Sequence, residues 1–416
     1  MFLCTGCADR DRINPVDPNN PDTMGRPSGV TVISIQDTVK LSWDIIELKD
    51  LIGYQIYRKS SPESDFIPLA LVQPTVNLYE DTAVEFNVEY AYQISAVGST
   101  YESLRSNTVT ITPGPTFNWV SDNFNGQVVK LTHDAQQEIL RAGRFQNIID
   151  IEPNPITGDV WLIDRISLLF AELIRVSSGG KIKLPILQFT SPLDAALEIE
   201  TGALWVADST DNVVVKLDSA GNRLFAVTEL SNPIAVSVEQ RTGDCWVADN
   251  HANRIFRIKS DGTEILASSV NLNAVQSISV NSLSGDVWVA DSTRIVKIDE
   301  NGMLSLEPGQ RFHFASTIDV NANTGEVWVI DLLFQFNEST VSKFSPEGQK
   351  LFEINGFTIP EDLSINLFDD SCIVADTEND RIVRISSDGT ISGVLNSIGF
   401  PRAVSVENQP NVNNTN

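Results

Sequence analysis

The sequence predicts an all-β protein of two parts, and two observations predict it. Between residues 29 and 113, short runs with an apolar side chain at every second position alternate with turn residues, which is typical of an antiparallel sandwich of about seven strands. From residue 117 onward, the pattern Trp-x-x-Asp returns every 40 to 45 residues, with four strand-like runs in each copy. A repeat of that length and content predicts a β-propeller.

The composition restricts the classes of partner. The chain has 416 residues, with 55 acidic against 29 basic side chains and a formal net charge of −26. That charge argues against nucleic acid as a partner and against polybasic docking to an anionic membrane. It is compatible with basic partners or with divalent cations. No run of about 18 apolar residues is present, so the sequence predicts no transmembrane helix.

Residues 1–27 form a polar tail after a short apolar start. The stretch "LCTGC", which ends at Cys7, resembles the end of a bacterial lipoprotein signal peptide, where a small residue precedes a lipidated cysteine. The resemblance implies lipid attachment at Cys7, a proline-rich tether and an extracytoplasmic location in the bacterial cell envelope, with the membrane reached only through the lipid. The alternative is a disordered tail with two incidental cysteines.

The first folded part is expected over residues 28–114. Its strand-like runs include "LSWD" with Trp43, "GYQIYR" with Tyr54 and Tyr57, and "YQISAV" with Tyr92. These runs resemble a fibronectin type III domain, in which a tryptophan on the second strand and a corner tyrosine belong to the core. The resemblance implies that the aromatic side chains pack inside and that the domain acts as a spacer or an adhesion module.

The second part is expected over residues 115–408, followed by a disordered tail over residues 409–416. The Trp-x-x-Asp pattern begins at six tryptophans, and a seventh copy has Ile373 in that place; the tryptophans are Trp119, Trp161, Trp205, Trp246, Trp288 and Trp328. The last strand-like run, "PRAVSV", has no tryptophan strand after it, and the first copy has no such run before it. We therefore predict that the last strand joins the first copy and closes a ring of seven blades, which removes exposed sheet edges. Six blades are the alternative, if the first copy lies outside the ring.

The repeat resembles the NHL-repeat propellers and, more loosely, the propellers of streptogramin B lyases and gluconolactonases. The resemblance rests on "LWVAD", "CWVAD", "VWVAD" and their variants together with the glycine turn that follows the next strand of each copy. It implies an architecture rather than a reaction, because propellers carry many unrelated functions.

The aspartate that ends each Trp-x-x-Asp pattern is interpreted as part of the architecture. It stands where a strand gives way to a polar loop, so its carboxylate is expected to accept backbone N–H groups of that turn. The alternative is a ring of carboxylates that binds a cation such as calcium on the propeller axis; otherwise no cofactor is expected. Cys245 and Cys372 stand beside the tryptophan position, where the other copies are mostly apolar, so we expect two free thiols in the core.

Candidate binding residues are sought where the copies differ. His251, Arg311, His313, Glu361, Asp362 and Arg402 fall on or near the rim that carries the aspartate loops. Two loops of that rim are apolar instead of polar, "DRISLLFAE" and "DLLFQFNE"; they contain Leu169, Phe170, Leu333 and Phe334. Clustered apolar side chains on a surface often mark an interaction site. The alternative is that the loops fold back onto their own blades or receive the fibronectin-like domain.

The sequence favours a binding protein over an enzyme. It contains no His-Glu-x-x-His, Gly-x-Ser-x-Gly or phosphate-loop motif, and we predict no catalytic residue and no metal ligand. The expected protein is a monomer of the cell surface or periplasm that binds a protein or a glycan through the propeller rim. The alternative is an extracytoplasmic lyase or lactone hydrolase with a metal at the propeller mouth.

Overall fold

The computed structural model describes residues 25–48, 50–333 and 338–408. By its contacts the chain divides into two compact units, Met1–Pro115 with Thr132–Gln137, and Thr116–Leu131 with Glu138–Asn416. The predicted lipid-attachment residue Cys7, the predicted binding residue Phe334 and the predicted tail over residues 409–416 lie outside the described ranges. Within those ranges the protein is built from strands, with one 3-10 turn, η1 (Thr377–Asn379), as its helical element. No helix there is long and apolar enough to cross a membrane.

The first unit consists of two antiparallel sheets around an aromatic core. One sheet has the order β1-β2-β5 and the other the order β4-β3-β6-β7. The bounds are β1 (Thr31–Ile35), β2 (Thr38–Ser42), β3 (Leu51–Ser60), β4 (Ile67–Val72), β5 (Leu78–Asp81), β6 (Tyr90–Gly98) and β7 (Val109–Ile111). The buried Trp43 ring meets the Tyr54 ring edge-on at 5.4 Å between centres. The buried Tyr92 hydroxyl donates a 2.9 Å hydrogen bond to Asp81 Oδ2, so the polar end of this core aromatic is satisfied.

The strands of the second unit form seven four-stranded antiparallel sheets within the described ranges. Sheet 1 contains β8 (Phe117–Asp122), β9 (Gln127–Leu131), β10 (Glu138–Ala142) and β35 (Val404–Glu407). Sheet 2 contains β11 (Ile148–Pro153), β12 (Val160–Ser167), β13 (Phe170–Val176) and β14 (Ile182–Phe189). Sheet 3 contains β15 (Pro192–Glu198), β16 (Ala203–Asp208), β17 (Val213–Leu217) and β18 (Arg223–Val227).

The other four sheets repeat this plan. Sheet 4 contains β19 (Pro233–Glu239), β20 (Asp244–Asp249), β21 (Arg254–Ile258) and β22 (Ile265–Ala267). Sheet 5 contains β23 (Val275–Val280), β24 (Val287–Asp291), β25 (Arg294–Ile298) and β26 (Leu304–Leu306). Sheet 6 contains β27 (Ala315–Val320), β28 (Val327–Asp331), β29 (Ser339–Phe344) and β30 (Lys350–Phe357), and sheet 7 contains β31 (Pro360–Ile365), β32 (Cys372–Asp376), β33 (Arg381–Ile385) and β34 (Ile391–Leu395).

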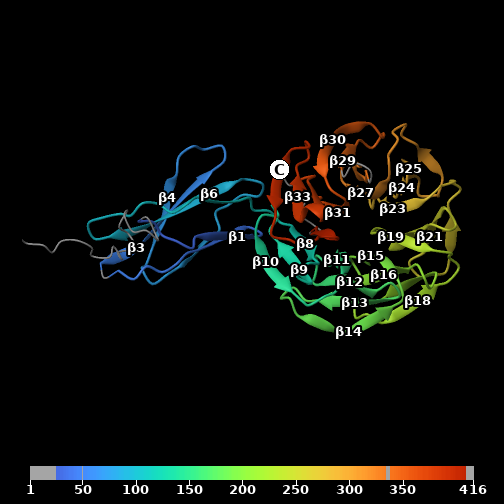
Figure 1. Cartoon of the computed structure of the whole chain (residues 1–416), viewed down its shortest axis with the longest axis horizontal. Helices are drawn as coiled ribbons and strands as arrows, with labels where there is room; N and C mark the ends of the chain where they lie inside the picture. The colour runs from blue at the N-terminus through green and yellow to red at the C-terminus, as the bar shows by residue number, and fades with distance from the viewer. Residues whose placement is uncertain (1–24, 49, 334–337, 409–416) are drawn as a thin grey trace, which may run out of the picture. The chain divides into compact units, whose positions relative to one another are not determined.

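The sheets of the second unit are arranged around a centre in a propeller-like fold. In Figure 1 the first strands β11, β15, β19, β23, β27 and β31 lie toward that centre, and the fourth strands β14, β18 and β30 lie at the circumference. The last strand, β35, pairs antiparallel with β8, with Val404 opposite Val120 and Val406 opposite Asn118. The pairing that the sequence predicts between the end of the chain and its first repeat is therefore present.

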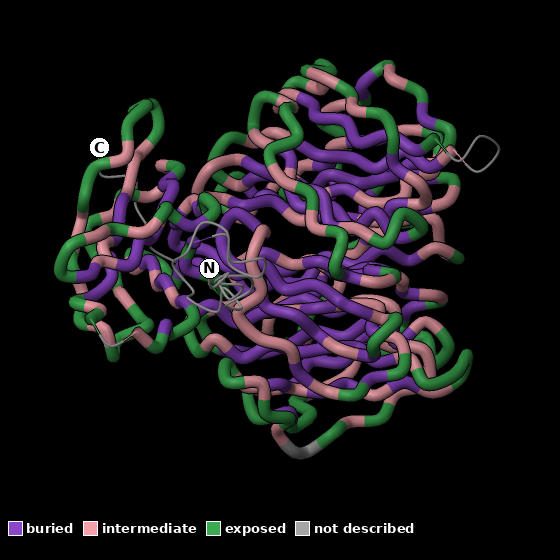
Figure 2. The backbone as a smooth tube through the Cα atoms, turned by 60° about the vertical axis from the view of Figure 1, so that its left-hand side comes forward, coloured by how far each residue is buried: buried purple, intermediate pink, exposed green. Residues whose placement is uncertain are grey.

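Each repeat tryptophan fills the space between its own sheet and the next one. Trp205 of sheet 3 is fully buried and shares a core cluster with Val236 and Val247 of sheet 4. Figure 2 shows buried residues along the strands of this unit and exposed residues mainly at its turns. Cys245 belongs to the same cluster, and both Cys245 and Cys372 are buried and free, as the sequence predicts.

A basic residue on the third strand of several sheets joins the tryptophan to the following sheet. Lys216 Nζ lies 4.8 Å from the centre of the Trp205 ring and donates a 2.8 Å hydrogen bond to the carbonyl oxygen of Ser260 in sheet 4. The same contact recurs in other sheets, where Arg175 reaches Ser219 O, Arg257 reaches Glu300 O and Lys343 reaches Ser387 O. The charged group thus makes a cation–π contact with the tryptophan ring of its own sheet and also donates a hydrogen bond to a turn carbonyl of the following sheet.

Candidate functional site

The repeat aspartates are buried and bonded to backbone amides. Asp208 has no exposed surface, and its carboxylate accepts N–H groups of Thr190 at 2.9 Å, Ser191 at 3.1 Å and Asp211 at 3.3 Å. Thr190 and Ser191 belong to the connection that enters the first strand of the same sheet, so the carboxylate does more than cap its own turn. Pairs of equivalent bonds occur at Asp164, Asp249 and Asp291. These aspartates hold each incoming connection to the second strand of its sheet.

A second set of carboxylates lines a central cavity of about 330 Å³. The walls come from the first strands of sheets 2 to 7 and from β35. Asp150, Asp194 and Asp362 occupy one position of the repeat, because each pairs with the residue just before the repeat aspartate. Glu152 and Asp319 stand two residues further along, opposite Trp161 and Trp328. Side chains two residues apart face the same side of a strand, so five carboxylates face the cavity.

These cavity carboxylates connect neighbouring sheets. Asp150 Oδ2 accepts the Ala195 amide at 2.7 Å, Asp194 Oδ2 accepts the Val236 amide at 2.7 Å, and Asp362 Oδ2 accepts the Val404 amide at 2.9 Å. A first strand has no neighbouring strand on the cavity side, so its amides there need other acceptors. Each carboxylate supplies that acceptor to the next sheet.

Burial raises the pKa of these carboxyl groups. The pKa of Asp150 rises to about 7 and that of Asp319 to about 6, in both cases because burial disfavours the charged form. Burial also raises the pKa values of Glu152, Asp194 and Asp362, with further increases from neighbouring carboxylates. Among the residues that the structure describes, no lysine, arginine or histidine lines the cavity. These carboxyl groups therefore keep their protons to a higher pH than exposed carboxyl groups do.

Three predicted site residues come together where the chain enters β31 and β35. The Arg402 guanidinium forms an ion pair with the Glu361 carboxylate, and Asp362 is the next residue on β31. Arg165, which follows the repeat aspartate of sheet 2, belongs to the same group: burial lowers its pKa, Arg402 lowers it further, and Glu361 opposes the change. Sequence reasoning missed Arg165, although the other copies have no arginine directly after that aspartate.

The other polar candidates are dispersed on exposed loops. His251 lies in the turn between β20 and β21, while Arg311 and His313 lie in the connection before β27. His313 Nδ1 is 3.3 Å from Asp331 Oδ2. No hydrogen bond or ion pair within the described ranges joins His251 or Arg311 to the Arg402–Glu361 pair. The same ranges contain no group of three or more histidine, cysteine, aspartate or glutamate residues arranged to hold a metal ion.

The two apolar loops differ in exposure. In sheet 2, Ser167 pairs with Phe170, so Leu168 and Leu169 form the tip of a tight hairpin, with exposed fractions of 85% and 67%. Phe170 is half-buried. In sheet 6, Leu332 is buried and Leu333 is half-buried, with its amide donating to Ser339 Oγ at 3.3 Å. The structure therefore places Leu169 in water and folds the start of the second loop onto the sheet.

Comparisons with known proteins relate the chain to others mainly through its fold. No protein-family model matches it. An amylopullulanase from Thermoanaerobacter thermohydrosulfuricus is 41% identical over 63 residues, which is 15% of this chain and 4% of the length of that enzyme.

Solved structures match over a much larger share of the chain. A protein of unknown function from Desulfotomaculum acetoxidans DSM 771 has a TM-score of 0.57 at 12% identity and covers 70% of this chain and 98% of its own. A candidate 6-phosphogluconolactonase from Bacteroides uniformis ATCC 8492 has a TM-score of 0.55 at 11% identity and covers 70% and 99%. Kuenenia stuttgartiensis hydrazine synthase has a TM-score of 0.50 at 11% identity and covers 59% and 78%. At such identities the likeness is one of fold, and it is an all-β, propeller-like fold.

Proposed function

We propose that this chain is a binding protein that takes a protein or a glycan at the rim of a seven-bladed, NHL-like propeller, with a fibronectin type III-like unit as its spacer. The observation that carries the proposal is the β12–β13 hairpin. Its tip exposes 85% of Leu168 and 67% of Leu169. Two neighbouring large aliphatic side chains in water lose a favourable burial free energy of about 1.5–3 kcal/mol each. A partner that covers the tip recovers that free energy.

The proposal is tested by comparing capture from an extract of the source cells on immobilised full chain and on the double variant Leu168→Ser and Leu169→Ser. A partner of the rim should be retained by the wild type and strongly reduced on the variant. Leu283→Ser is the matched control. Leu283 is 68% exposed, but it lies in the turn between β23 and β24, at the opposite end of its sheet. Equal loss with the control, or equal retention by all three proteins, contradicts a rim site at this hairpin.

A second proposal is a lyase or lactone hydrolase with a divalent cation such as calcium at the propeller mouth. The candidate 6-phosphogluconolactonase among the structures of similar fold supports it, as does the meeting of Glu361, Asp362 and Arg402 beside the central cavity. The test is hydrolysis of a sugar lactone with and without calcium. Activity that Glu361→Gln abolishes, in a protein whose melting temperature is unchanged, favours the enzyme over the binding protein.

We also propose that the chain is anchored in the bacterial cell envelope through a lipid on Cys7. The motivation is the sequence "LCTGC" at that residue. The test is expression behind a lipoprotein leader and labelling with radioactive palmitate, with Cys7→Ser as the variant. Label that persists after this substitution removes Cys7 as the acceptor.

A further inference from the structure

The geometry points to a peptide-binding groove between sheets 2 and 3. The ligand is a short extended segment of a partner protein, in which a basic residue, an apolar stretch and an acidic residue follow one another. The groove is a cavity of about 300 Å³, lined among others by Leu169, Phe170, Phe189, Asp211, Val213 and Arg223. The inference rests on the proposed function in its protein-binding form and goes beyond it by naming the place and the chemistry of the partner.

The middle of the groove is apolar. Leu169 comes from the hairpin tip, Phe170 begins β13, and Phe189 ends β14. Val213 begins β17 on the facing sheet. Leu169 is 67% exposed, and the other three are half-buried, so their remaining apolar surface is open to a ligand. Burying such surface supplies most of the binding free energy at a peptide site.

Two residues of opposite charge line the groove, and their backbones lie beside opposite ends of β17. Asp211 lies in the turn before β17, and Arg223 begins β18, where it is paired with Leu217 at the far end of β17. The four steps from Val213 to Leu217 span about 13 Å at roughly 3.3 Å per residue. The backbone positions that carry the carboxylate and the guanidinium therefore lie at opposite ends of β17, about one extended tetrapeptide apart.

Both of these charges are open to a partner. Asp211 is exposed, and its Oδ2 accepts one hydrogen bond, from the Thr190 hydroxyl at 2.9 Å. Arg223 is exposed and has no hydrogen bond or ion pair within the described ranges. Asp208 also lines the groove, but it is buried and bound to three backbone amides. Asp211 and Arg223 therefore determine, by charge complementarity, in which of its two orientations the peptide binds.

The experiment is selection of phage-displayed linear dodecapeptides on the full chain, followed by fluorescence polarisation with the enriched peptides. We expect enrichment of basic–apolar–acidic sequences, and about tenfold weaker binding or more by Leu169→Ser, because Leu169 is an apolar wall of the groove. Asp211→Asn and Arg223→Gln should each weaken binding by about two- to fivefold, with a reduced dependence on salt, as exposed charges do.

Leu224→Ser is the matched control, because Leu224 is 54% exposed beside Arg223 on β18 and is not among the residues that line the groove. It should change the affinity by less than about twofold, as surface substitutions usually do. Equal loss from Leu224→Ser and Leu169→Ser overturns the groove and leaves the hairpin tip, which the capture experiment with Leu168→Ser and Leu169→Ser tests, as the binding site of the proposed function. Three outcomes overturn the inference directly. The enriched peptides lack the basic–apolar–acidic order, their affinity is unchanged by Asp211→Asn and Arg223→Gln, or no peptide is enriched.

Discussion

Asp194 Oδ2 accepts a 2.7 Å hydrogen bond from the backbone amide of Val236, which lies on the first strand of the next sheet. The same relationship joins Asp150 to Ala195 and Asp362 to Val404. In an ordinary sheet these amides would bind a neighbouring strand, but around a central cavity no strand is there. Acidic side chains therefore serve the architecture at the centre of the second unit, and their burial makes its stability depend on pH.

The first prediction concerns that pH dependence. Asp150 has a folded-state pKa of about 7 and Asp319 of about 6, whereas an unfolded aspartate has a pKa of about 3.9. Because the folded pKa values are raised, these groups favour the folded state fully below about pH 4, and that contribution is lost as the pH rises through the folded pKa values. We expect a lower melting temperature at pH 8 than at pH 5.

The double variant Asp150→Asn and Asp194→Asn separates the cost of ionising these buried carboxyl groups from the general repulsion among the many acidic residues of the chain. Asparagine keeps an acceptor for the Ala195 and Val236 amides and cannot ionise. The difference in melting temperature between pH 5 and pH 8, followed by calorimetry, should shrink in the variant. An unchanged difference would assign the pH dependence to other groups.

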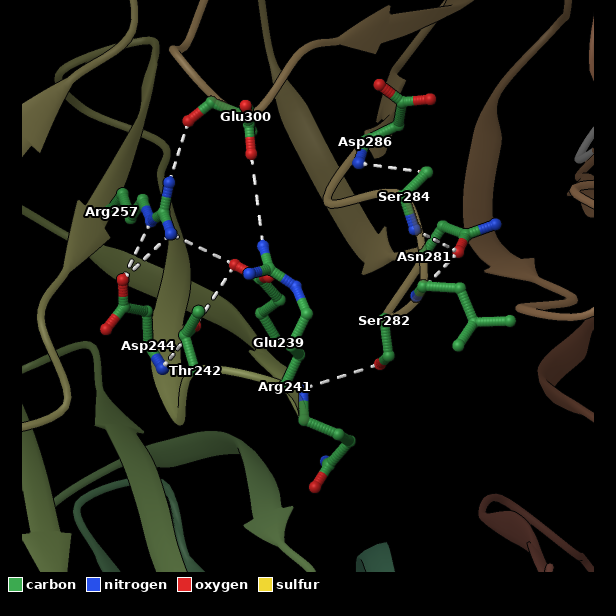
Figure 3. Close-up of polar contacts among 12 residues, drawn as sticks. Glu239, Arg241, Thr242, Asp244, Arg257, Asn281, Ser282, Ser284, Asp286 and Glu300 are labelled. Atoms are coloured by element: carbon green, nitrogen blue, oxygen red, sulfur yellow. Dashed lines mark hydrogen bonds and ion pairs between the residues drawn. The ribbon is translucent and has the colours of Figure 1, made fainter.

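The second prediction compares two arginines that share one buried partner, Glu239 (Figure 3). Arg257 is 11% exposed and also binds Asp244, which is almost fully buried. Arg257→Met leaves both carboxylates without this partner and should lower the free energy of unfolding by about 3–5 kcal/mol. Arg241 is 54% exposed, so Arg241→Met should cost about 0–1 kcal/mol. Denaturant unfolding measures both, and similar costs would refute the importance of burial.

The third prediction concerns the repeat aspartate of sheet 3. Asp208→Ala removes the acceptor of three amides, and each buried amide left unpaired costs about 1–3 kcal/mol. We expect a clear loss of thermal stability that added calcium does not change. Asp211→Ala is the control, because that carboxylate is exposed and accepts one side-chain bond. A calcium-dependent rise in melting temperature that Asp208→Ala abolishes would favour a cation site instead.

The fourth prediction concerns the two core thiols. Cys245 and Cys372 have no exposed surface, and burial raises the pKa of each thiol. Since the thiolate is the reactive form, neither should react with a disulfide reagent while the protein is folded, and both should react after denaturation. The measurement uses a Cys4→Ser and Cys7→Ser background, so that only these two thiols are counted. Rapid reaction of the folded protein would contradict their placement in the core.

Much of the second unit was predictable because its sequence repeats. The regular spacing of the Trp-x-x-Asp pattern places each tryptophan strand, and the unmatched last run predicts the pairing of β35 with β8 that the structure contains. The burial of Cys245 and Cys372 was predictable because the position before the tryptophan is apolar in most other copies. A signal for the cavity acids was also present: Asp150, Asp194 and Asp362 are charged residues inside strands, at the position where sheets 4, 5 and 6 have alanine, serine and threonine. Only Asp362 of that set was predicted as a site residue.

The sequence by itself determined the all-β class and the order of the strands, because period-two alternation and a fixed repeat length are local properties of the chain. Only the tertiary structure decided which carboxylates bind the amides of a neighbouring sheet, which basic residue lies on which tryptophan, and that Leu169 stands beside Phe189 and Asp211 in one groove. The bond from Val236 to Asp194 and the placement of Leu169 beside Asp211 join residues of different sheets, 42 positions apart in the chain. They depend on the rotation from one sheet to the next, which no single repeat encodes.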